Sequence, residues 1–139
     1  MFSRSKAKIN VLLKESWSSL SDGTNVRWVK IFHLYKGFWR RSTHEGLFVK
    51  GSAQVVEPPQ ITYKGTKFKY SKKGDIIRSI IIRTFKPTKN KTGFVILTNT
   101  NDSLTIKKKQ TLKSKYVKGV VFTNALKRRK FITLFSKTF

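Results

Sequence analysis

The chain has 139 residues and carries 31 Lys and Arg against six Asp and Glu, a formal net charge of +25 at pH 7. Such a charge opposes compaction, so a chain of this size is expected to bind a polyanion: nucleic acid, an anionic membrane surface or an acidic polymer. The absence of cysteine excludes disulfides and cysteine-ligated metal sites. Aromatic residues make up 13% of the chain, too many for a disordered basic tail, so one folded domain is expected.

The first twenty residues are basic, rich in Ser and poor in acids, as organelle transit peptides are. They lack a small-residue cleavage site. We therefore expect residues 1–20 to be an uncleaved N-terminal basic extension and residues 21–139 to form the domain. The bias toward Lys, Asn, Ile, Phe and Tyr suits a gene of high A/T content, as in an organellar genome.

Two strands are predicted before residue 57. Residues 26–35 follow the turn signal Asp22-Gly23 and are mostly apolar at both even and odd positions, so one face should meet a core and the other should be covered. A weaker strand is predicted over residues 47–56, before two prolines that cannot continue a ladder. Residues 57–74, where aromatic residues interleave with lysines, are interpreted as a basic hairpin or long loop.

The clearest predicted strand covers residues 76–84, an isoleucine-rich run that opens after Lys72-Lys73-Gly74-Asp75. Arg78 and Arg83 have opposite parity in this run, so they are expected on opposite faces of the sheet.

The rest of the chain gives weaker signals. Residues 94–97 and 117–122 are predicted as short strands, whereas residues 98–115 are polar with little periodicity. A short helical turn over residues 125–130 and a last strand-like piece are expected at the end of the chain. Short strands separated by Gly- and Pro-marked turns predict a mainly β fold: a small five-stranded β-barrel with basic loops and a short C-terminal helical segment.

Catalysis finds little support in the sequence, and we expect no enzyme activity and no cofactor. The six acids are widely spaced, and Asp22 and Asp75 are interpreted as turn formers and not as a general acid/base pair. His33 lies inside an apolar strand and His44 in a loop, so no metal set or catalytic triad emerges. A structural Mg²⁺ would enter only as an ion bound to RNA.

Cationic clusters supply the binding chemistry, because Lys and Arg that neutralise phosphates release counterions. Trp39 beside Arg40 could stack on an unpaired base, although packing of Trp39 on the barrel is the favoured interpretation. For Arg83, a phosphate contact and closure of the strand end are equally compatible with the sequence. The candidate RNA-binding residues are Arg40, Arg41, Lys72, Lys73, Arg83, Lys107, Lys108, Lys109, Lys127, Arg128, Arg129 and Lys130.

Four blocks in order carry a family resemblance: residues 22–37, 72–84, 93–102 and 126–135. They contain an Asp-Gly-Thr-Asn turn before a strand that ends in Gly37, Lys-Gly-Asp before an Ile-rich strand that closes on Arg83-Thr84, Phe-Val-Ile-Leu, and a basic segment that ends in Phe131. The chain resembles the universal large-ribosomal-subunit protein fourteen family, over roughly residues 20–139. It departs from the family pattern in the exchange of Gly23 and Asn25, in an insertion near residues 57–71 and over the more basic residues 102–116.

The resemblance implies a structural constituent of the large ribosomal subunit that binds ribosomal RNA and neighbouring ribosomal proteins. It also implies a contribution to an intersubunit bridge with small-subunit RNA and a docking surface for a ribosome-silencing factor. The N-terminal extension and the divergence indicate a mitochondrial form, and the residue bias indicates that it is organelle-encoded.

Two other classes of protein remain as alternatives. One is a free-standing single-stranded nucleic-acid-binding barrel, which would need exposed aromatics in register on one strand face; the strand aromatics are instead expected on both barrel faces. The other is a cationic membrane-surface protein, for which only residues 5–20 could offer an amphipathic helix. No apolar run reaches the ~18–20 residues of a membrane span, so no membrane partner is expected.

Overall fold

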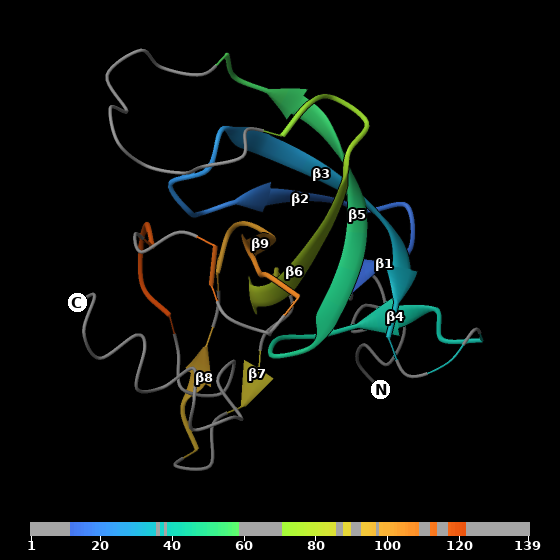
Figure 1. Ribbon diagram of the computed structural model, residues 1–139. Coiled ribbons are helices and arrows are strands. Elements are labelled where there is room, and N and C mark those ends of the chain that lie inside the picture. Colours follow the sequence, from blue (N-terminus) through green and yellow to red (C-terminus); the bar gives the residue numbers. More distant parts are fainter. Residues whose placement is uncertain are drawn as a thin grey trace.

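The computed structural model describes residues 12–35, 37, 39–58, 71–85, 88–89, 93–96, 98–108, 112–113 and 117–121. Five strands close a barrel: β2 (Trp17–Leu20), β3 (Val26–Leu34), β5 (Phe48–Val56), β6 (Ile76–Arg83) and β9 (Asp102–Thr105) (Figure 1). Two small two-stranded sheets lie beside it. They pair β1 (Leu12–Leu13) with β4 (Ser42–Thr43), and β7 (Thr88–Lys89) with β8 (Val95–Ile96).

Each barrel strand pairs with the next barrel strand along the chain, and all of these pairs are antiparallel. Because five is an odd number, the first and last strands of such a meander run in the same direction. β2 and β9 accordingly close the barrel as a parallel pair, with Ser19 opposite Asp102. The mainly β fold and the five-stranded barrel predicted from the sequence are confirmed.

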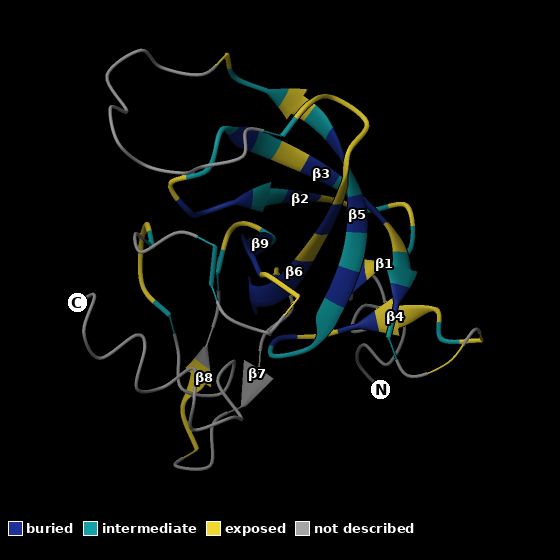
Figure 2. Ribbon diagram, viewed as in Figure 1, coloured by how far each residue is buried: buried dark blue, intermediate teal, exposed yellow. Residues whose placement is uncertain are grey.

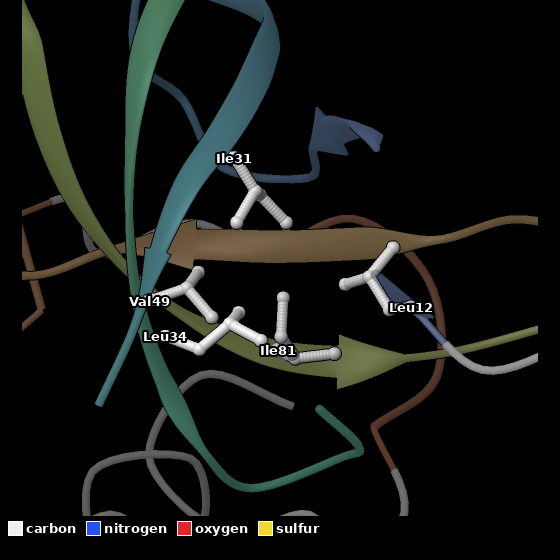
Figure 3. Packing of buried hydrophobic residues seen from close by; sticks show 5 residues of the cluster. All are labelled: Leu12, Ile31, Leu34, Val49 and Ile81. Carbon is white, nitrogen blue, oxygen red and sulfur yellow. The ribbon is translucent and has the colours of Figure 1, made fainter. Parts of the chain in front are cut away.

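The barrel interior is filled by inward-facing aliphatic side chains, as the alternation of strand residues requires. One cluster gathers near the β1–β4 sheet and is shown in Figure 3: Leu12, Ile31, Leu34, Val49 and Ile81, all at most 2% exposed. A second cluster toward the other end contains Leu20, Val26, Val29, Ala53 and Ile77.

A further core lies on the outer side of β6 and β9. Ile80, Ile82, Leu104 and Ile106 are buried there against Phe48, Leu112, Val117 and Val121. Residues that follow β9 therefore cover the outside of the barrel. This explains the three consecutive isoleucines at 80–82, because this part of β6 is buried on both faces.

Gly51 on β5 marks a close approach between strands. A Cβ atom there would lie 2.2 Å from a Val29 methyl carbon and 2.8 Å from the Lys30 carbonyl oxygen. Since real Cβ atoms do not approach backbone this closely, only glycine fits without moving β3.

The barrel begins earlier in the chain than the sequence analysis expects. β2 lies inside residues 1–20, which were expected to be an extension, and it is one of the five barrel strands. Residues 98–115, in which the sequence analysis placed no element, contain β9, and all four of its residues are buried. Both strands carry polar side chains that bond to each other: Ser18 Oγ donates to Ser103 Oγ at 3.0 Å, and Ser19 Oγ donates to Asp102 Oδ1.

Other predicted elements can be placed. Residues 26–35, 47–56, 76–84 and 94–97 correspond to β3, β5, β6 and β8. Within the described residues 117–121 there is a single bridge, Asp22 with Val117, and no strand. The helical segment at 125–130 lies outside the described residues, as does most of the 57–71 insertion.

The outer face of β3 differs from its prediction. Trp28 and Phe32 are 42% and 41% exposed, so this face is not covered as the apolar pattern suggests (Figure 2). In the part of the chain that the structure describes, no helix is long and apolar enough to cross a membrane.

Candidate nucleic-acid interface

Lys72 and Lys73 are presented by a tight turn that leads into β6. The Lys72 amide donates to Asp75 Oδ2 at 2.8 Å, and the Gly74 amide donates to the Ala53 carbonyl at 2.8 Å. Gly74 has a φ of 89°, which favours glycine. The prediction that Asp75 is a turn former is confirmed, and this turn holds both lysine side chains in solvent.

The same end of the barrel carries Lys107 and Lys108. They follow Ile106, whose amide donates to the Arg78 carbonyl near the start of β6 at 3.0 Å. The loop closes through the Ile106–Leu112 bridge, and Lys113 Nζ then donates to Ser71 Oγ at 3.4 Å. Two lysine pairs that lie some 35 residues apart in sequence (107 minus 72) thus reach one surface.

We call this surface the β6-start cluster. Its members are Lys72, Lys73, Arg78, Lys107, Lys108 and Lys113. Among the described residues, no carboxylate oxygen lies within 4.0 Å of any of these cationic groups. The sequence analysis did not select Arg78 or Lys113 for this cluster. The exposed outward position of Arg78 on β6 was a signal that could have identified it, whereas Lys113 joins only through its contact with Ser71.

Arg40 and Arg41 lie toward the opposite end of β5. Arg40 Nε donates to the Ser42 carbonyl at 3.0 Å, and the Arg41 side chain is exposed. Trp39 beside them is 84% exposed. The interpretation that Trp39 packs on the barrel was therefore wrong, because an indole buried against a sheet would lose most of its accessible surface.

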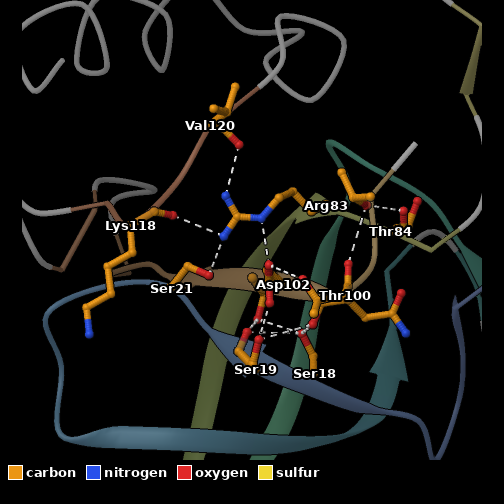
Figure 4. Close-up of polar contacts among 12 residues, drawn as sticks. Ser18, Ser19, Ser21, Arg83, Thr84, Thr100, Asp102, Lys118 and Val120 are labelled. Carbon is orange, nitrogen blue, oxygen red and sulfur yellow. Dashed lines mark hydrogen bonds and ion pairs between the residues drawn. The ribbon is translucent and has the colours of Figure 1, made fainter. Parts of the chain in front are cut away.

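Arg83 is engaged inside the protein. Its Nε donates to Asp102 Oδ2 at 2.6 Å, Nη1 donates to the Val120 carbonyl at 2.9 Å, and Nη2 donates to Ser21 Oγ and to the Lys118 carbonyl (Figure 4). The guanidinium thereby ties residues 117–121 to the barrel. Of the two alternatives that the sequence left open for Arg83, the structure shows closure of the strand end.

The Asp102 carboxylate is the centre of this clamp. Burial alone would raise the pKa of Asp102, but hydrogen bonds from Ser19, Thr100 and Arg83, with the charge of Arg83, outweigh burial and lower that pKa. The side chains of Arg83 and Asp102 are only 11% and 7% exposed. The ion pair is therefore a structural element of the barrel closure.

Five other candidate RNA-binding residues lie outside the described residues, so their role stays a prediction: Lys109, Lys127, Arg128, Arg129 and Lys130. Asp22 accepts from the Thr24 and Thr105 amides at 3.1 and 2.9 Å, which confirms it as a turn former. No group of three His, Asp or Glu side chains that could hold a metal ion occurs within the described ranges.

Comparisons with known proteins agree with these features. The family model described as "Ribosomal protein L14p/L23e" matches residues 11–138. A relative from Tetrahymena pyriformis named "Large ribosomal subunit protein uL14m" is 31% identical over 125 residues, which cover 90% of this chain and 97% of the relative. The matched range includes β2, the first strand of the barrel.

Proposed function

Because the chain belongs to the ribosomal protein L14p/L23e family, we propose that it is a structural constituent of the large subunit of a mitochondrial ribosome. Its role there is to bind ribosomal RNA and to hold neighbouring ribosomal proteins, without catalysis. The mitochondrial assignment is supported by the relative named uL14m. Encoding of the chain in the organelle is part of the same proposal and is supported only by residue composition.

The β6-start cluster is the observation that carries RNA binding. Six cations from three chain segments meet there, and none has a carboxylate partner among the described residues. In a protein with only six acids, the natural counterions for such a surface are phosphates. The exposed Arg41, with the 84% exposed Trp39 in the same loop, supplies a second contact region toward the other end of β5.

A salt series tests this interface. Binding of the full chain to protein-free large-subunit RNA should weaken steeply with salt, and Lys72→Ala with Lys73→Ala should reduce the slope of log K against log salt by about 1–2. The matched control is Arg27→Ala with Glu57→Ala, which removes an ion pair and leaves the net charge unchanged. Unchanged slopes in the lysine variant would contradict the proposal.

Two more specific contacts are proposed on the basis of the family. We propose that the chain contributes to an intersubunit bridge with small-subunit RNA and offers a docking surface for a ribosome-silencing factor. Subunits that carry a variant defective only in these contacts should form a normal large-subunit peak and a reduced peak of joined subunits. Normal joining by every surface variant would contradict the bridge.

For the alternative of a free-standing single-stranded nucleic-acid-binding barrel, one observation is favourable and another is unfavourable. Trp17 and Trp28 are exposed on neighbouring strands, as such a module requires. However, oligonucleotide-binding barrels have Greek-key connections, whereas here each barrel strand pairs with the next. The topology therefore favours the ribosomal role.

A further inference from the structure

The outer face of β2, β3 and β5 presents exposed apolar side chains that the RNA-binding proposal does not use. Trp17, Trp28 and Val55 are 47%, 42% and 45% exposed. The two indole rings lie 6.4 Å apart and are tilted by 56°. Trp28 and Val55 are directly opposite each other in the β3–β5 register, so they share one face. We call these three residues the aromatic face.

Cations beside the aromatic face are paired with carboxylates, unlike those of the β6-start cluster among the described residues. Lys30, which is opposite Trp17 in the β2–β3 register, pairs with Glu15 at 3.0 Å. Arg27, which precedes Trp28, forms a double hydrogen bond with Glu57 at 2.6 and 2.9 Å. That hydrogen bond is the main cause that lowers the pKa of Glu57, so the carboxylate stays charged.

Both acids are held in place by the backbone. The Glu15 amide donates to the Ile31 carbonyl at 2.7 Å, and the Glu57 amide donates to the Asn25 carbonyl at 2.8 Å. The main chain of each acid is therefore fixed beside β3, which carries both cations.

The positions of all six acids bear on the contrast between the aromatic face and the β6-start cluster. Asp22, Glu45 and Asp102 are at most 5% exposed and serve the interior. Asp75 shapes the turn before β6. The two that remain, Glu15 and Glu57, both flank the aromatic face. Two of the three acids that are not buried therefore lie beside Trp17 and Trp28, and the third, Asp75, lies in the turn of the β6-start cluster.

We propose that the aromatic face docks onto an apolar surface of another protein in the large subunit, and not onto RNA. A face that gathers phosphates would keep its cations free, as the β6-start cluster does. A protein partner instead favours exposed aromatics surrounded by paired charges, the usual anatomy of an interface core and rim. The inference rests on the proposed ribosomal role, since it takes the partner to be a neighbouring protein of that assembly.

The experiment compares two targets for the full chain: large-subunit cores that were washed free of it with salt but retain their other proteins, and protein-free large-subunit RNA. Trp17→Ser with Trp28→Ser should weaken binding to the cores by at least about tenfold. The same variant should leave RNA binding within about twofold. Lys72→Ala with Lys73→Ala is the matched control and should weaken RNA binding.

Val55→Lys distinguishes a protein partner from RNA without removing an aromatic ring. A buried protein interface should lose binding to the cores when a charge enters it, whereas a face that stacks RNA bases should gain affinity from an added cation. Circular dichroism and the thermal midpoint establish that each variant is folded, and Val55→Lys carries the test if the Trp variant does not fold.

The outcomes are distinct. Equal loss on both targets would make the face an RNA-binding one, and no loss on either target would leave it without a partner; both overturn the proposal. Concentration-dependent dimerisation that the Trp variant abolishes would identify a second copy as the occupant and would also overturn it. A wild-type chain that binds neither target contradicts the proposed function itself.

Discussion

Asp102 connects β9 to three other segments of the chain. Its carboxylate accepts from Ser19 on β2, from Thr100 and from Arg83 on β6. Removal of one partner from a nearly buried ion pair leaves the other charge uncompensated. The residue that the sequence suggested only as an isolated acid is therefore central to the closure of the barrel.

Asp102→Asn should lower the free energy of unfolding by about 3 kcal/mol at neutral pH. The pKa of Asp102 is lowered in the folded state, so its stabilising contribution is present above the unfolded pKa of about 3.9 and is lost as pH falls through the folded value. Denaturant titrations from pH 7 to pH 2 check this: the wild-type curve should fall below about pH 4 more than that of the variant. Parallel curves would contradict the assignment.

Gly51→Ala should destabilise the protein by about 1–3 kcal/mol, because the new methyl group would overlap Val29 and the Lys30 carbonyl. Gln54→Ala on the same strand is the control, since Gln54 is half-exposed and bonds only to Ser52 among the described contacts. Urea midpoints measure both variants. Equal midpoints would mean that β3 can move away from β5 at little cost.

At the scale of elements, β3 and β6 could be predicted and β2 and β9 could not. The runs in β3 and β6 are rich in β-branched residues, and the 80–82 part of β6 is buried by the barrel interior on one side and by the outer core on the other. Propensity and burial therefore agree in these strands. In β2 and β9, serines are buried because they bond to residues more than eighty positions away, as Ser18 does with Ser103. No local pattern reveals that pairing.

The outer core makes β9 an energetic part of the fold. Leu104→Ala should cost about 2–5 kcal/mol, because Leu104 is 1% exposed between Ile80, Ile82 and Ile106. Val120→Ala should be nearly neutral, since Val120 is 63% exposed and contributes its carbonyl to Arg83. Thermal denaturation of both variants measures the difference. A small effect of Leu104→Ala would show that residues after β9 do not pack as described.

Only part of the candidate site could be predicted from the sequence, because its residues come together through long-range strand pairing. Runs such as Lys72-Lys73 and Lys107-Lys108 are visible in the sequence, but their convergence depends on the antiparallel β6–β9 pair. Arg83 looks like another free cation in the sequence, and only the fold reveals its bonds to residues 118 and 120. The exposure of Trp39 was likewise misjudged, because an aromatic residue in a loop carries no signal of which side it faces.

For the whole molecule, the charge of +25 is distributed in a definite way. Arg83 is paired with Asp102 at the end of β6, Arg27 and Lys30 are paired beside the aromatic face, and the β6-start cluster has no member paired with a carboxylate among the described residues. Phosphates are expected to bind the β6-start cluster, and a protein is expected to bind the aromatic face. The barrel then acts as a spacer that keeps two different contacts apart within one assembly.

Sedimentation of the native extract through a sucrose gradient tests the central claim most directly. In low salt with Mg²⁺, the chain should sediment with the large ribosomal subunit, and it should move to the top of the gradient as salt is raised, because its phosphate contacts are screened. A chain that stays at the top of the gradient in low salt and Mg²⁺ would contradict the ribosomal role.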